Sequence, residues 1–195
     1  MPAGTDEKFF HQIPSKNQCA SCHTTNHSEG ALLPIGLKAR HLNHSNTDHG
    51  KNQLLYLQKN RQLAGLSNLE KVPKLADFSD QSESLEARAR AYLDINCAHC
   101  HNKQGPADTS ALLLEYTDLD PRSYGRCKPP IAAGRGSGGL LYSIVPGQAH
   151  ESIMSFRLSS RDPAEMMPEI GRTLVHAEGV ALINRWINSM SGRCV

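Results

Sequence analysis

Apolar residues recur at helical spacing near the C-terminal end of the chain. Residues 176–190 read HAEGVALINRWINSM, in which apolar side chains three or four positions apart fall on one face. This face comprises Val180, Leu182, Ile183, Trp186, Ile187 and Met190. The pattern predicts an amphipathic helix that packs against the core, and we expect Trp186 to be a packing residue.

A second helical pattern covers residues 84–101, SLEARARAYLDINCAHCH. Ser82 or Ser84 can cap its N-terminus. Its apolar positions are Leu85, Ala89, Tyr92 or Leu93, and Ile95. Shorter helical pieces are predicted within residues 50–63 and 150–158.

The remaining sequence favours irregular structure. No segment alternates apolar and polar residues over several positions, so strands are not expected. Residues 128–139, KPPIAAGRGSGG, predict a loop whose backbone can approach a flat partner closely. A polar, turn-rich stretch at 71–84 separates two units, residues 1–78 and 80–195. We therefore expect a mainly α protein with long irregular loops.

Composition adds a constraint on the core. Hydrophobic residues make up 38% of the 195 residues and aromatic residues 5%, which is thin for two self-sufficient small cores. The formal charge of +2 comes without long blocks of one sign, so nucleic-acid binding is not indicated. No apolar run is long enough for a membrane span, and the start, MPAGTDEKFF, lacks the pattern of a signal peptide.

The motif CxxCH occurs twice, as CASCH at 19–23 and CAHCH at 97–101. Two matches in a chain with six cysteines and ten histidines are too rare to be chance. In c-type haem attachment, the two thiols bond to the porphyrin and the following histidine is the proximal iron ligand. The motifs thus predict two haem c groups, attached through Cys19 and Cys22 with His23, and through Cys97 and Cys100 with His101.

Two other uses of such cysteine pairs fit less well. Structural zinc sites repeat their pairs at shorter spacing and need no histidine directly after the second cysteine. A thioredoxin-like redox pair belongs to a βαβ context, which this sequence lacks. Two haems would also supply the apolar bulk that the composition lacks.

The second haem needs a distal ligand. In EMMPEIG, Pro168 biases Met167 toward an extended backbone that can present its thioether to iron, which makes Met167 our prediction. Met154 and Met190 lie in helical patterns and are expected in the core. The alternatives are Met166, His150, His176 or an open position.

The first unit contains no methionine except Met1, so a different distal ligand is expected there. His44 and then His41, about twenty residues beyond the proximal ligand, are the preferred candidates, and they would give a bis-His haem. The other candidates are His11, His27, His49 and Lys38.

Cys127 and Cys194 lie outside the two motifs. Haem c is assembled outside the bacterial cytoplasm, where disulfides persist, so these cysteines can form a bridge. Two separate thiols are the alternative.

Longer stretches around both motifs resemble a group of bacterial diheme c-type cytochromes of uncharacterised role. In the second half these are residues 95–114, 127–147 and 152–187, and in the first half residues 13–23, 34–43 and 52–57. Together the similarity covers most of residues 9–190. It implies two tandem cytochrome c-like haem domains and a periplasmic or exported protein whose export signal lies outside this sequence. Members of the group are often the C-terminal part of a longer chain, with residues corresponding to His101 and Met167 as the axial pair.

These features predict an electron-transfer protein that exchanges electrons with redox partner proteins and uses no catalytic side chains. The main alternative is a diheme oxidoreductase, peroxidase-like, with an open distal site on one haem. A redox or ligand sensor is the third hypothesis.

Overall fold

The computed structural model describes residues 10, 13–24, 31–32, 34–46, 48 and 50–195. Within these residues it is mainly α-helical, as predicted, and contains isolated β-bridges but no strands. The α-helices are α1 (Lys16–His23), α2 (Ala39–Leu42), α3 (Gln53–Lys59), α4 (Leu85–Asn96), α5 (Ile153–Ser159) and α6 (Ala177–Ser189). Short 3₁₀ helices are η1 (Leu69–Lys71), η2 (Asp108–Ser110), η3 (Gly134–Ser137) and η4 (Ala149–Glu151).

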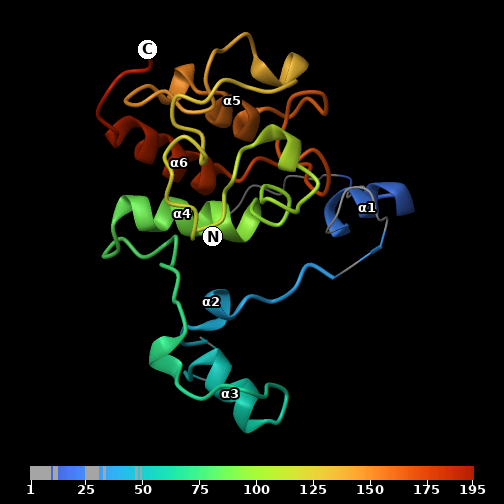
Figure 1. Cartoon of the computed structure of the whole chain (residues 1–195), viewed down its shortest axis with the longest axis vertical. Helices are drawn as coiled ribbons and strands as arrows, with labels where there is room; N and C mark the ends of the chain where they lie inside the picture. The colour runs from blue at the N-terminus through green and yellow to red at the C-terminus, as the bar shows by residue number, and fades with distance from the viewer. Residues whose placement is uncertain (1–9, 11–12, 25–30, 33, 47, 49) are drawn as a thin grey trace.

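The core lies where α4, α5 and α6 pack together, as the upper part of Figure 1 shows. The face predicted for residues 176–190 is buried: Leu182, Ile183, Trp186 and Ile187 lie in the core, with Val180 and Met190 packed at its edge. Other buried members include Ala89, Leu93, Leu114, Ile144 and Met154. Trp186 packs against Tyr124 in a tilted arrangement, with ring centroids 5.8 Å apart, in the packing role expected for it.

Helix α4 begins as the sequence predicts and ends earlier. The Ser84 side chain accepts a hydrogen bond from the backbone N–H of Ala87 and caps the helix. The helix ends at Asn96, so the second motif forms a turn rather than its last helical turn. The expectation that Ile95 is buried is wrong, because its side chain is 52% exposed. Two residues correspond to about 200° around a helix, which places Ile95 opposite the buried Leu93.

The described residues among the first 78 do not gather into one compact body. In Figure 1, α1 lies beside the upper part of the molecule, whereas α2 and α3 form a lower lobe reached through an extended segment. Helix α1 has a capping box between Ser15 and Gln18 but buries no side chain. The segment predicted to be helical at 50–63 forms the shorter α3, which buries Leu54.

Asp94 connects the lower lobe to α4. Its carboxylate is fully buried and accepts hydrogen bonds from the Arg40 guanidinium at 2.9 and 3.1 Å and from the backbone N–H of Tyr116 at 2.7 Å. His41 Nε2 lies 2.5 Å from the same carboxylate. Burial alone would raise the pKa of Asp94, but these hydrogen bonds outweigh it and hold the pKa below 3.8.

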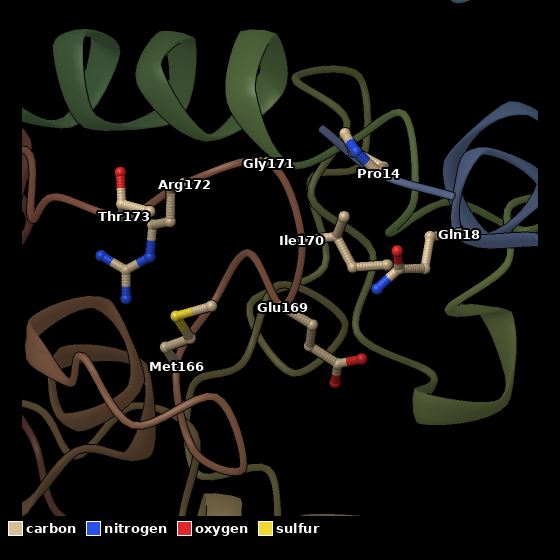
Figure 2. A pocket seen from close by; sticks show the side chains of 8 residues that line it. All are labelled: Pro14, Gln18, Met166, Glu169, Ile170, Gly171, Arg172 and Thr173. Carbon is tan, nitrogen blue, oxygen red and sulfur yellow. The ribbon is translucent and has the colours of Figure 1, made fainter. Parts of the chain in front are cut away.

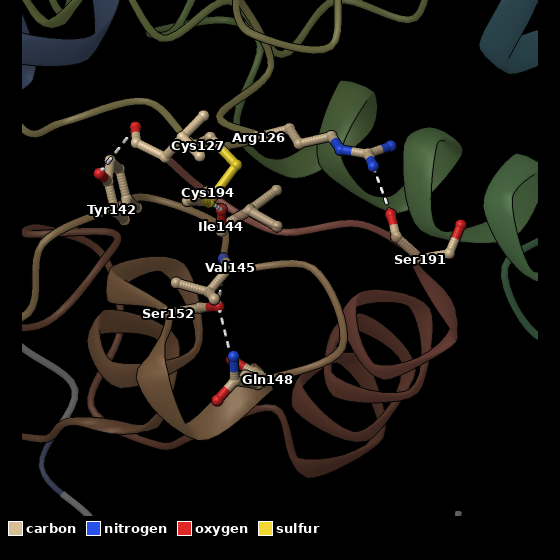
Figure 3. The surroundings of a disulfide bond; sticks show 10 residues. Arg126, Cys127, Tyr142, Ile144, Val145, Gln148, Ser152, Ser191 and Cys194 are labelled. Atoms are coloured by element: carbon tan, nitrogen blue, oxygen red, sulfur yellow. Dashed lines mark hydrogen bonds between the residues drawn. A yellow bond between two sulfur atoms is a disulfide. The ribbon is translucent and has the colours of Figure 1, made fainter.

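A disulfide closes the C-terminal end. Cys127 and Cys194 are joined with a Cα–Cα distance of 5.2 Å, across 67 residues of sequence. Figure 3 shows that Arg126, next to Cys127, donates a hydrogen bond to the carbonyl of Ser191, and the backbone N–H of Cys127 donates to Ile144. The bridge therefore fastens the end of the chain to the segment that follows the buried Tyr124. Within the described part of the chain, none of the helices has both the length and the apolarity needed to cross a bilayer.

Replacing Asp94 with Asn should lower the free energy of unfolding by about 1.5–3 kcal/mol, because the buried, charge-assisted hydrogen bonds to Arg40 are lost. A carboxylate with a depressed pKa stabilises the fold above its unfolded pKa, and this contribution disappears as the pH falls through the lower folded value. The variant should therefore lose part of the acid sensitivity expected of the wild type below pH 3.8. Urea unfolding as a function of pH measures both effects. The matched control is Glu83→Gln, an exposed carboxylate just before α4, and equal effects of the two changes would contradict the role given to Asp94.

The disulfide generates a second prediction about stability. In the double variant Cys127→Ala/Cys194→Ala the free energy of unfolding should be about 4 kcal/mol lower than in wild type. The reason is that the bridge restricts the unfolded chain by closing a loop across 67 residues. Dithiothreitol should shift the wild-type urea midpoint in the same direction and leave that of the double variant unchanged. A wild-type midpoint that does not respond to the reductant would show that the bridge contributes nothing.

Candidate haem-binding site

The second CxxCH motif opens onto a large cavity of about 610 Å³. Such a volume lies within the roughly 300–1,000 Å³ typical of ligand and cofactor pockets. Cys97, Cys100 and His101 line it on one side. Its other walls come from α5 and from two loops, residues 128–133 and 164–170. The first half of the segment predicted to approach a flat partner, residues 128–133, therefore contributes to this cavity, whereas the glycines at 134–139 do not line it.

A close turn fixes the second motif at the mouth of the cavity. Gly105 approaches the backbone so closely that a Cβ there would lie 2.3 Å from the carbonyl oxygen of Cys100. The side-chain amide of Asn102 donates a hydrogen bond to the backbone carbonyl of Ala98 at 2.7 Å. The backbone N–H of Leu114 donates to the backbone carbonyl of His101 at 2.8 Å. The motif is thus held by its own backbone independently of anything that binds in the cavity.

The His101 ring is half-buried and suited to hold a metal ion. Burial lowers the pKa of His101 to about 4, although a hydrogen bond to the backbone carbonyl of Leu112 acts in the opposite direction. The imidazole is therefore neutral at neutral pH, as iron coordination requires. Burial raises the pKa of the Cys97 and Cys100 thiols to about 12, and the proximity of Cys22 adds to the shift at Cys100. Both thiols are uncharged, which suits an apolar cavity.

The two neighbouring methionines face different surroundings. Met167 lines the large cavity together with His101. Met166 is buried and lines a separate cavity of about 30 Å³, where Figure 2 shows it near Arg172 and Ile170. Met154, expected in the core, is in the core cluster and also reaches the wall of the large cavity. Of the methionines weighed as ligands, Met167 alone lies in a loop and lines this cavity.

Two arginines hold the loop that carries Met167. The Arg172 guanidinium donates to the carbonyls of Leu158 and Ser160, and Arg157 Nε donates to that of Glu165 at 2.8 Å. The backbone N–H of Met167 donates to the carbonyl of Arg157 at 3.0 Å. The position of Met167 is therefore set by hydrogen bonds to the end of α5.

The two histidines weighed for this haem lie elsewhere. His176 Nδ1 lies 3.0 Å from the hydroxyl of Tyr92, and the two rings stack. The His150 side chain is 77% exposed and pairs with Glu151 at 3.6 Å. Neither lines the large cavity.

Lys128 is a buried cation on the cavity wall. Its residue is 8% exposed, and burial, then the charge of Arg122, lowers the pKa of its ammonium group. Among the described residues the partner of Lys128 Nζ is the carbonyl of Pro129 at 3.4 Å, and no carboxylate lies within ion-pair distance. Because a buried cation is stabilised by a counter-ion, this wall is suited to an anionic group of a ligand.

The first motif occupies α1, with Cys19, Cys22 and His23 in the helix. Cys22 lines the large cavity, whereas Cys19 and His23 line neither of the two cavities. Pro14 and Gln18, beside this motif, face the loop that carries Met166 and Met167 (Figure 2). The first motif is thus packed against the wall of the second site.

The candidate distal ligands of the first haem have other partners in this structure. His41 Nε2 lies against Asp94, His44 is exposed, and Lys38 forms an ion pair with Glu115 at 3.5 Å. His11, His27 and His49 lie outside the described residues. The bis-His assignment stays a prediction.

Sequence reasoning passed over His99, the spacer residue of CAHCH. A ring nitrogen of His99 and the sulfurs of Cys22 and Cys100 all lie within 4.8 Å of one another. Burial, then the positive charges of Lys38 and His23, lowers the pKa of His99. Its place beside a cysteine could have been predicted from the sequence, because His99 directly precedes Cys100 in the motif.

Comparison of the chain with family models, with curated proteins and with solved structures found no match. The functional assignment therefore rests on the residues themselves and on the geometry described above.

Proposed function

We propose that this protein is a diheme c-type cytochrome that transfers electrons between redox partner proteins. One observation carries the proposal: Cys97, Cys100, His101 and Met167 line one cavity of cofactor size. Cys97 and Cys100 would hold the porphyrin covalently, and His101 and Met167 would ligate the iron. The group supplies one-electron redox chemistry when bound, and a Met ligand opposite a His raises its reduction potential.

The walls of this cavity support the assignment. Its lining is mostly apolar, as a macrocycle requires, with Leu93, Leu114 and Leu158 among its members. Lys128 supplies a buried positive charge suited to a carboxylate, and haem carries two propionates. Burial keeps His101 neutral. These are the properties expected of residues that hold a haem.

The first haem is proposed from its motif. Cys19 and Cys22 would attach it and His23 would ligate its iron, giving two tandem haem units with a boundary near residues 78–80. An exported location is part of the proposal, because haem c is matured outside the bacterial cytoplasm. The Cys127–Cys194 disulfide supports this location, since such bonds persist in oxidising compartments.

A metal site is the second candidate function, since one observation favours it. The cluster of Cys22, His99 and Cys100 provides two sulfurs and one nitrogen within 4.8 Å of one another. Zinc binds such donors and deprotonates the thiols that coordinate it. A single ion would, however, leave the 610 Å³ cavity without a role.

The number of covalent haems tests the proposal directly. Protein matured in a bacterial periplasm should weigh as much as its polypeptide plus two haems, and its Soret band should survive extraction with acidified acetone. Cys19→Ser/Cys22→Ser and Cys97→Ser/Cys100→Ser should each remove one haem. A protein that matures without added mass but binds zinc would overturn the proposal in favour of the metal site.

Ligand binding separates a carrier from a diheme oxidoreductase or a sensor. In a carrier both irons are six-coordinate and low-spin, and carbon monoxide or cyanide binds slowly or not at all. An oxidoreductase or sensor with an open distal site should show high-spin bands and rapidly bind one equivalent of carbon monoxide or cyanide.

Replacing Met167 with Ala should abolish the weak sulfur-to-iron absorption band of the oxidised protein and lower the potential of one haem, because the thioether ligand is lost. The matched control is Met166→Ala, which removes a buried side chain outside the large cavity and should keep the band. Visible spectra and a potentiometric titration measure both effects. Persistence of the band in Met167→Ala and its loss in Met154→Ala would move the assignment to Met154, which lines the same cavity.

A further inference from the structure

The two haem attachment motifs meet at one point in the structure. Cys22 comes from α1 and Cys100 from the turn after α4, yet their sulfur atoms lie within 4.8 Å of each other. A ring nitrogen of His99 lies within the same distance of both sulfurs. Nothing in the motif itself requires this contact, since each CxxCH can bind its haem without the other.

Two further observations place α1 against the second site. Cys22 lines the same cavity as Cys97 and His101. Glu169 and Ile170 line both this cavity and the small one that Pro14 and Gln18 border (Figure 2). The contact therefore belongs to a continuous packed surface and is not a single chance approach.

We propose that the chain holds its two haems as one contact pair, joined where Cys22, His99 and Cys100 meet, so that the charge on each haem sets the reduction potential of the other. The inference rests on the proposed function. Each attachment sulfur is one bond away from a substituent carbon of its porphyrin, so two sulfurs within 4.8 Å bring the edges of the two macrocycles together. Within a partly buried junction, charges interact more strongly than they do in water.

His99 is the positioning residue of this pair. Its half-buried side chain has a ring nitrogen within 4.8 Å of both attachment sulfurs, those of Cys22 and Cys100. Changing the size or polarity of this side chain should therefore alter the surroundings of both haems. A change at an exposed histidine such as His150 should alter neither.

Circular dichroism in the Soret region tests the contact in the intact holoprotein. Two porphyrins held in contact should give a bisignate couplet, and its amplitude per protein should not change on dilution. The couplet should disappear in Cys19→Ser/Cys22→Ser, which keeps one haem. A potentiometric titration of wild type should show two separate reduction steps. In the variant, the reduction potential of the remaining haem should differ from both wild-type potentials.

The outcomes distinguish this inference from the proposed function. A mass that includes two haems, with no couplet and with a remaining haem whose potential is unchanged when the other is removed, would overturn the contact pair and leave the diheme assignment intact. Absence of covalent haem would instead remove the proposed function.

The His99→Gln and His150→Gln pair tests the position of the junction. His99→Gln should change the couplet amplitude and shift both potentials, while His150→Gln should leave the couplet and the potentials as in wild type. A shift confined to one haem in His99→Gln would contradict the placement of His99 between the two.

Discussion

The buried carboxylate of Asp94 is the interaction on which the arrangement of the chain depends. It lies in the last turn of α4, just before the second motif, and it binds Arg40 and His41 of α2 together with the backbone of Tyr116. A buried charge is stable only when its partners are in place, so the lower lobe, α4 and the segment after the motif must come together at once. The position of Cys97 and His101 follows from the end of α4 that this cluster fixes.

Around the cavity, helices form the core and one wall, and loops present most of the side chains on the other side. Helices α4 and α6 form the core, and α5 supplies one wall of the cavity. The residues that face a ligand from the other side come from loops: Met167 from one held by hydrogen bonds to the end of α5, and Lys128 from the segment that begins at the disulfide. Loops of this kind present side chains without the spacing that a helix would impose.

Residues with local signals could be predicted from the sequence. The apolar face of α6, the Ser84 cap of α4 and the different surroundings of Met167 in EMMPEIG all follow from periodicity, capping chemistry or the effect of Pro168. The early end of α4 could not be predicted, because it depends on the turn that packs Gly105 against Cys100. The exposure of Ile95 was open to prediction, because Ile95 lies about 200° around the helix from the buried Leu93. The contacts of His41 with Asp94 and of His99 with Cys22 join distant parts of the chain, and no pattern in either segment specifies them.

Helix α1 carries the first motif but buries none of its own side chains. Burial of apolar surface is the main source of stability in a small protein, so this helix contributes little to the folding of the body beside it. The body built from α4, α5 and α6 can therefore fold without α1 in place. In the proposed diheme protein, the haem attached to α1 would secure this helix, so maturation and docking of the segment would be the same event.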